Sequence, residues 1–403
     1  MIDIVRACPV CDGRKAEVLH SQRFVLSDDK KLAWSCAVVA CARCDAAFAD
    51  TPVTQKEYDE LYAERSRYAA GPAAHATEHD RDTSRFREMA AAIRDVVPDP
   101  TAHIADVGCA NGQMLAALGA LGCTRLTGID PSPGCVAQAG AIRGVEAHVG
   151  SLSHIPAGVG PFDLVILSHV LEHVRDLKAA LRYLRSFLSS DGVVYVEVPD
   201  ASRYTEFAWS PFQDFNTEHI NHFSLVTLAN LLRQCGLRPL VSGAKDILSA
   251  PGMPYPAIYW FGRLDPGVRP VIERDHALVE RLREYVRVSH RLMAAIDARL
   301  VDRLGDGRPA VVWGTGELTA KLLAETFLER ARVIAFVDGN PVNHGRTLRG
   351  LPILAPADLE SSDAVIVVAS ILHHDSIVRA IRGLGLRNPV LGLVKDTCPT
   401  SAS

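Results

Sequence analysis

The chain has 403 residues, of which 48% are apolar and 22% charged, a composition typical of soluble globular domains. Its net charge of −4, without a run of five or more basic residues, argues against nucleic acid or an anionic membrane as the main partner. No apolar stretch reaches the ~18 residues of a membrane-spanning helix, and the start of the chain lacks the pattern of a signal peptide. We therefore expect a cytoplasmic protein whose ten cysteines are thiols or metal ligands.

Two C-x-x-C pairs predict a zinc-binding module over residues 1–60. The ligands would be Cys8 and Cys11 in CPVC, and Cys41 and Cys44 in CARC. Each pair suits a tight turn that aims two thiolates at one ion, and four protein ligands make a closed, structural site. Short strands are expected between the pairs, at 23–26 and 31–34, and Cys36 is a substitute ligand. The alternative is four reduced thiols without metal.

The next part of the chain predicts a parallel sheet. Apolar residues at helical spacing over 86–97 end at Pro98. Apolar runs then alternate with helical patterns, which indicates strands joined by crossover helices. The expected strands are 103–107, 125–129, 162–167 and 192–198, and the expected helices are 113–121, 177–188 and 225–235.

A glycine turn follows the first of these strands, in the segment DVGCANG at 106–112. Gly108 and Gly112 permit a sharp turn and a close backbone approach to a ligand, and the helix that follows points its N–H groups at the same place. The next strand ends at Asp130, 22 residues after Gly108, where a carboxylate can accept hydrogen bonds from a ribose. A dinucleotide site is the competing interpretation, but G-C-A-N-G departs from its G-x-G-x-x-G fingerprint.

These residues resemble the class I methyltransferases, which use S-adenosylmethionine. The resemblance implies such a domain over residues 61–245, with Ser168 and His169 lining the pocket beyond the fourth strand and a backbone contact to adenine near Ser151. The cofactor-binding residues that it implies are Asp106, Gly108, Cys109, Ala110, Gly112, Asp130, Pro131, Ser151, Leu152, Ser168 and His169.

Polar residues that suit acid–base chemistry gather after the fifth strand, in FQDFNTEHINHFS. His219 and Glu218 lie in this loop, and His173 follows the fourth strand, so both loops leave the same edge of a parallel sheet. A histidine is the usual general base near neutral pH. Asn216 is a further candidate at the catalytic centre, and His222 is a candidate for binding the substrate. Two alternatives are open: a cation held by Glu218, His219 and His222, or a packing role for His222.

The order of segments resembles the sugar C-methyltransferases, which act on nucleotide-linked keto-deoxysugars. The match covers nearly the whole chain, and its most specific part is E-H-x-x-x-F-S at 218–224. The resemblance implies that His219 removes the proton beside a ketone, that Glu218 binds sugar, and that Tyr68, or else Tyr62, reaches the site. Asn216 replaces a tyrosine of the family, and SAPGMPYPAIYW departs from its next motif. An O- or N-methyltransferase acting on another metabolite therefore stays open.

Residues 245–270, rich in Pro and Gly, predict a loop, and 271–304 a connecting helix; together they make a linker over 246–304. Residues 305–403 then repeat the strand–helix alternation. Gly314 and Gly316 follow a strand, and Asp338 ends the next one, as in a dinucleotide-binding unit. An NAD-using oxidoreductase or nucleotide-binding regulator is one interpretation. The family resemblance instead implies that this domain holds the nucleotide of the substrate, with Arg346 in reach of phosphate.

The sequence thus predicts an α/β protein in which a class I methyltransferase domain lies between an N-terminal zinc module and a second, Rossmann-like domain. Its expected ligands are S-adenosylmethionine, structural zinc and a small-molecule substrate, a nucleotide sugar. The partner is predicted to be neither nucleic acid nor membrane, and the sequence leaves the oligomeric state open.

Overall fold

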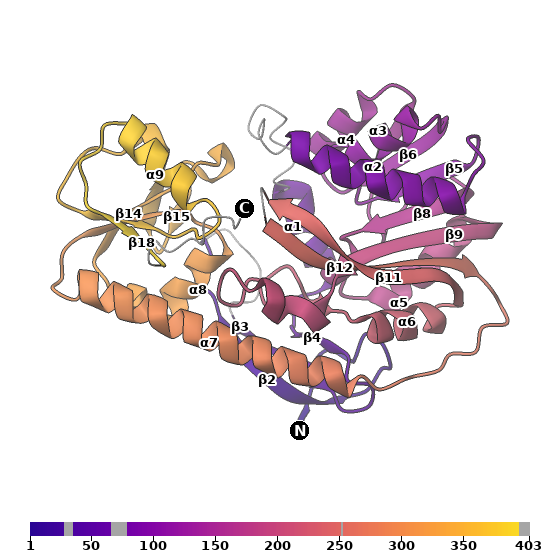
Figure 1. The fold of residues 1–403 in the computed structure, drawn as a ribbon, viewed down its shortest axis with the longest axis horizontal. Helices are drawn as coiled ribbons and strands as arrows, with labels where there is room; N and C mark the ends of the chain where they lie inside the picture. Colours follow the sequence, from indigo (N-terminus) through magenta and orange to yellow (C-terminus); the bar gives the residue numbers. More distant parts are fainter. Residues whose placement is uncertain (28–34, 66–78, 251–252, 395–403) are drawn as a thin grey trace, which may run out of the picture. The chain divides into compact units, whose positions relative to one another are not determined.

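A computed structural model describes residues 1–27, 35–65, 79–250 and 253–394 (Figure 1). The chain divides into two compact units, which are described separately. The first comprises residues 1–19, 38–207 and 218–282, and the second comprises residues 20–37, 208–217 and 283 onward. Within the described ranges, no helix combines the length and the apolar character that crossing a membrane requires.

The first unit is built on a seven-stranded sheet, in the order β11-β12-β9-β8-β5-β6-β7. Five strands are parallel to their neighbours, and the hairpin β11–β12 joins antiparallel to β9. The strands are β5 (His103–Val107), β6 (Arg125–Asp130), β7 (Val145–Val149), β8 (Phe162–Ser168), β9 (Leu188–Pro199), β11 (Leu237–Ala250) and β12 (Met253–Leu264). The predicted parallel sheet is confirmed, and its continuous apolar runs arise because helices cover both faces.

Helices pack on this sheet through apolar residues at helical spacing. Met89 and Ile93 of α2 join Leu115 and Leu118 of α3 in one core with the buried residues of β5 and β8. The helices of the unit are α1 (Gln55–Arg65), α2 (His79–Val96), α3 (Gln113–Ala120), α4 (Pro133–Gly140), α5 (Leu177–Leu184) and α6 (Leu225–Gln234). Ser224 begins α6 with a capping box, which fixes the exit from the loop that carries His219.

The prediction of a loop over 245–270 is wrong, because 245–250 lie in β11 and 253–264 form β12. Pro254 and Pro256 suggested a break, since proline cannot donate to a β-ladder. The N–H of Asp200, the residue after β9, donates to the Pro256 carbonyl. The backbone carbonyl of Pro256 therefore points toward β9. The paired register with β9 ends at Ala257 opposite Pro199, so Pro254 and Pro256 lie beyond it.

A separate five-stranded sheet, β1-β2-β3-β4-β10, carries the cysteines. Its strands are β1 (Ile2–Asp3), β2 (Lys15–Arg23), β3 (Ser35–Cys41), β4 (Ala47–Asp50) and β10 (Asn221–His222). The strand predicted at 23–26 shares only Arg23 with β2, and the one at 31–34 lies outside the described residues. Strand β10, which follows β9 in the chain, pairs antiparallel with β4.

The second unit contains a six-stranded sheet, β15-β16-β14-β13-β17-β18, whose central strands are parallel. The long helix α7 (His276–Leu304), orange in Figure 1, leads into it and confirms the predicted connecting helix. The other elements are β13 (Ala310–Trp313), α8 (Glu317–Glu325), β14 (Val333–Val337), β15 (Thr347–Leu348), β16 (Leu351–Leu354), β17 (Val365–Val368), α9 (His374–Gly383) and β18 (Val390–Gly392). From β13 the sheet grows to one side through β14 and to the other side through β17, which is the doubly wound order.

Candidate active site

The glycine turn lies between β5 and α3, at the carboxyl edge of the seven-stranded sheet. The carboxylate of Asp130 accepts hydrogen bonds from the N–H groups of Ala110, at 2.9 Å, and of Ser132, at 2.9 Å. These bonds fix the carboxylate beside the turn, and each oxygen keeps a lone pair for a ribose hydroxyl. No side chain caps α3, so its first N–H groups also face this place.

The two glycines of the turn are required by backbone geometry. Gly108 has φ of 84° and Gly112 has φ of 82°, in the left-handed region that other residues enter at a cost. A Cβ on Gly108 would meet Val170 at 2.7 Å, and one on Gly112 would meet Ile142 at 2.7 Å. The next residue but one after Gly108, Ala110, also takes a positive φ, of 46°.

Asp106 is the last residue but one of β5, before the turn, and its side chain is buried. Burial, and then the charge of Asp130, raise the pKa of Asp106 from 3.8 to about 7. Cys109 is buried as well. Two buried acids, Asp106 and Asp130, therefore flank the predicted cofactor position.

The residues predicted near adenine follow β7. The Gly150 N–H donates to the carbonyl of Asp130, and Ser151 and His154 exchange backbone hydrogen bonds. Leu152 is buried beneath this turn, whereas Pro131 is partly exposed. The backbone turn at 150–154 thus lies next to Asp130, as a backbone contact to adenine would need.

His169, predicted to line the cofactor pocket, bridges two buried carboxylates. Its Nδ1 lies 3.0 Å from Glu172 Oε1, and its Nε2 lies 3.3 Å from Glu197 Oε1. Burial and then the Arg85 charge act to lower the pKa of His169, but the hydrogen bonds to Glu172 and Glu197 outweigh them and raise it. The backbone of His169, just after β8, is strained, because its φ is 55°. Ser168, the last residue of β8, is partly exposed.

Two predicted imidazoles do meet at this edge. The rings of His173 and His219 lie 4.9 Å apart between centroids, in edge-to-face contact. Ligand atoms of Glu172, His173 and His219 lie within 4.8 Å of one another, close enough to hold a cation. Burial, and then the neighbouring His173, lower the pKa of His219 to about 3, so its ring is neutral at pH 7.

A tyrosine reaches this cluster, as the family resemblance implies. The Tyr62 hydroxyl lies 2.9 Å from His173 Nδ1, and the same nitrogen lies 3.1 Å from the carbonyl oxygen of Glu218. The carbonyl can only accept, which favours a proton on Nδ1 and a lone pair on Nε2 of His173. Tyr68, the first choice from the sequence, lies outside the described residues.

The remaining members of the 212–224 segment serve other contacts. His222 is buried in β10, its Nδ1 lies 3.4 Å from the Tyr204 hydroxyl, and burial, then Arg6, lower its pKa to about 3. This burial is consistent with the packing role that the sequence left open, and contact of His222 with the substrate stays a prediction. Asn216 donates its amide to the carbonyl of Gln213 at 3.0 Å.

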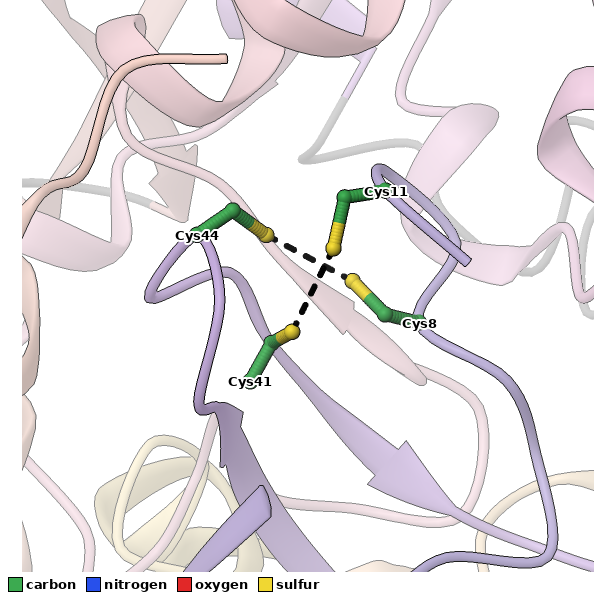
Figure 2. Close-up of side chains that lie close together, drawn as sticks. All are labelled: Cys8, Cys11, Cys41 and Cys44. Atoms are coloured by element: carbon green, nitrogen blue, oxygen red, sulfur yellow. Dashed lines mark hydrogen bonds between the residues drawn. The ribbon is translucent and has the colours of Figure 1, made fainter. Parts of the chain in front are cut away.

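The four predicted ligands of the N-terminal module converge on one point (Figure 2). Cys8 Sγ lies 3.6 Å from Cys44 Sγ, and Cys11 Sγ lies 3.4 Å from Cys41 Sγ. Zinc–thiolate bonds of ~2.3 Å would place tetrahedral sulfurs about 3.8 Å apart, so the set fits zinc. All four thiols are buried.

In the second unit, the predicted glycine turn follows β13. Gly314 has φ of 104°, and the Thr315 N–H donates to Asp338 Oδ2 at 3.0 Å. The Asn340 N–H donates to Asp338 Oδ1 at 2.8 Å. Gly316 is exposed at the start of α8, and Arg346 is partly exposed in the loop after β14.

Five further polar residues at the carboxyl edge of the seven-stranded sheet were not predicted from the sequence. Glu197 lies within β9 and is fully buried, and Arg85, Lys245 and Tyr195 surround it. Glu172 lies in the segment LEHV beside the predicted His173. The available signal was an acid inside the apolar strand VYVEV, which is rare without a partner.

Residues 80–242 match a family model described as a methyltransferase domain. The chain is similar to the solved structure of the 1,6-didemethyltoxoflavin-N1-methyltransferase of Burkholderia thailandensis, at 18% identity and a TM-score of 0.42, covering 56% of this chain and 96% of that one. It is also similar to an S-adenosylmethionine-dependent methyltransferase from Mesorhizobium loti, at 18% identity and a TM-score of 0.36, covering 43% of this chain and 95% of that one. A search of curated proteins found no match.

The family match and the strand order agree. The match spans the turn at 106–112, Asp130, and the cluster around His219, and the sheet has the class I order with an antiparallel hairpin beside its fifth strand. This part of the chain matches a methyltransferase domain, and its sheet has the strand order of the class I fold.

Proposed function

We propose that this enzyme methylates a carbon beside a ketone in a nucleotide-linked keto-deoxysugar, with His219 as the base. The observation that carries the proposal is the cluster of Tyr62, Glu172, His173 and His219 at the carboxyl edge of the sheet that holds the cofactor turn. Transfer of a methyl group to carbon needs an enolate, and an enolate needs a base positioned at the proton that is removed.

The surroundings of His219 suit this role. Its lowered pKa keeps it neutral, which is the form that accepts a proton, although the same shift weakens it as a base. The carboxylate of Glu172 lies within 4.8 Å and would stabilise the imidazolium that then forms, as an acid does beside other catalytic histidines. Burial acts to raise the pKa of Glu172, but the His169 hydrogen bond and the histidine charges outweigh it and lower that pKa to about 2.

The cofactor would be held by the residues of the turn. Asp130 would accept from the ribose, and the α3 N-terminus and the turn at 150–154 would contact the rest of the molecule. S-adenosylmethionine supplies an electrophilic methyl group on a sulfonium. Positioning of the acceptor against that group would provide much of the rate.

The glycine turn of the second unit would bind the nucleotide part of the acceptor. Gly314, Gly316 and Asp338 have the arrangement of a nucleotide-ribose site, and Arg346 follows it in the chain. The N-terminal cysteines would hold a structural zinc ion. An NAD site in the second unit is the alternative for the same turn, and it predicts tight binding of NAD.

A second candidate, an O- or N-methyltransferase, is favoured by Asn216. This position has no hydroxyl, and its amide is engaged with Gln213. The deciding experiment is exchange of the acceptor's α-proton in deuterium oxide, with S-adenosylhomocysteine bound and dTDP-linked 4-keto-deoxysugars as probes. Exchange that requires the enzyme is expected. Methyl transfer to oxygen or nitrogen of an acceptor whose α-proton does not exchange would reject carbon methylation.

A further inference from the structure

We infer that Arg85 and Lys245 form a binding site for an anionic group, a phosphate or a carboxylate, on the methyl acceptor. The inference rests on the proposed function only in taking the carboxyl edge of the sheet as the acceptor site. It specifies the acceptor's chemistry, which the methyltransferase assignment alone leaves open.

The two cations are held by one buried carboxylate. Glu197 has no solvent exposure, and its Oε1 accepts from Arg85 Nη2 at 2.9 Å. Its Oε2 accepts from the Tyr195 hydroxyl at 2.6 Å and pairs with the Lys245 ammonium. A carboxylate is rarely buried without such partners, because the loss of hydration is costly. Glu197 thus fixes both cations in place.

Positive charge exceeds negative charge at this point. Arg85 and Lys245 both pair with the single carboxylate of Glu197, and the His169 ring lies between Glu197 and Glu172. Burial acts to raise the pKa of Glu197, but the His169 hydrogen bond and the nearby cations hold that pKa well below its ordinary value. One unit of positive charge is therefore left for a ligand.

The cations retain donors and access to solvent. The side chain of Arg85 is 18% exposed and that of Lys245 is 30% exposed. Arg85 Nε is buried and lacks a hydrogen-bond partner among the described residues. A guanidinium presents its donors in a planar fork that matches carboxylate and phosphate oxygens, so the open side of Arg85 suits such an anion.

The position of the pair favours the acceptor over other ligands. Glu197 lies near the carboxyl end of β9, and Arg85 Nη2 also lies 3.4 Å from the hydroxyl of Ser168, at the end of β8. His169 connects Glu197 to Glu172, and Glu172 belongs to the His219 cluster. An anion on Arg85 and Lys245 would hold the acceptor beside the groups that activate it.

Titration of the full-length protein with inorganic pyrophosphate, with saturating S-adenosylhomocysteine present, tests the site by calorimetry. We expect Arg85→Gln and Lys245→Gln each to weaken one pyrophosphate-binding event at least tenfold, and Arg85→Lys to retain part of the affinity. Arg87→Gln is the matched control, because Arg87 is exposed on the same helix. The affinity for S-adenosylhomocysteine should stay within twofold.

Two results would overturn the inference. One is equal pyrophosphate binding by the wild type and both glutamine variants. The other is weakened binding of S-adenosylhomocysteine with pyrophosphate binding unchanged, which would assign the cations to the cofactor's own carboxylate. Neither measurement involves turnover, so a failure of the proton-exchange experiment leaves this test intact.

Discussion

The backbone N–H of Thr315 donates to the carboxylate of Asp338, 23 residues further along the chain, at 3.0 Å. Ala110 and Asp130 make the same contact in the first unit, at 2.9 Å. In each unit a second N–H, two residues after the acid, donates to its other oxygen. The chain therefore carries two glycine turns, each closed by the acid at the end of the following strand.

This duplication predicts a crossed pattern of binding defects. Asp130→Ala should weaken S-adenosylhomocysteine at least tenfold and leave the binding of dTDP unchanged, because each acid serves its own turn. Asp338→Ala should do the reverse. Calorimetry on both variants with both ligands checks the pattern. If Asp338→Ala left dTDP binding intact while abolishing tight NAD binding, the second turn would be a dinucleotide site.

Gly108→Ala should destroy cofactor binding and reduce stability. A positive φ alone costs an alanine about 1 kcal/mol, and the added Cβ would also meet Val170 at 2.7 Å. Gly122→Ala is the control, because Gly122 has φ of 86° but no atom within 4 Å of the built Cβ. Thermal unfolding should show a larger loss for Gly108→Ala, and only this variant should lose S-adenosylhomocysteine binding. Equal losses of stability in both variants would show that the contact between the added Cβ and Val170 does not destabilise the protein.

His219→Ala should lower methyl transfer by 10²- to 10⁴-fold, the usual contribution of a general base. The variant should bind S-adenosylhomocysteine normally and lose exchange of the α-proton. His373→Ala, an exposed histidine of the second unit, is the control. Full turnover by His219→Ala would exclude it as the base.

The raised pKa of Asp106 predicts how stability depends on pH. Because the folded protein binds this proton more tightly than the unfolded chain, the stabilisation is complete below pH 4 and is lost as the pH rises through about 7. Asp106→Asn should therefore be more stable than the wild type at pH 8, by at most about 4 kcal/mol, and the gain should shrink toward pH 4. Denaturant titrations from pH 4 to 8 measure this difference. The exposed Asp95→Asn is the control, and a pH-independent difference would contradict the assignment.

Zinc content provides a fifth test. The protein should contain one zinc ion per chain, and Cys41→Ser should lose it together with several kcal/mol of stability, since structural zinc contributes directly to folding. Cys36→Ser should keep the ion, because Cys36 is outside the four-sulfur set. Elemental analysis of the dialysed protein measures the zinc content of each variant. A zinc-free protein of undiminished stability would show that the thiols need no metal.

The sequence was informative where chemistry is local. The turn at 106–112, the cysteine pairs and the segment around His219 each lie within a few residues, and spacing alone brings their groups together. Arg85, Glu197 and Lys245 come from α2, β9 and β11, so only the fold unites them, and no short pattern marks them. The hairpin β11–β12 was mistaken for a loop because it contains prolines. A proline interrupts a β-ladder only where its nitrogen faces a paired strand, and that orientation depends on the fold.

The pairing of β4 with β10 also sets an order of events during synthesis. Residues 47–50 leave the ribosome about 170 residues before 221–222, their partners in the sheet. At ordinary translation speeds that interval is roughly ten to thirty seconds. During this time β4 has an unpaired edge, to which another nascent chain could attach. Yield in a host with depleted chaperones should therefore depend on how quickly residues 51–222 are translated.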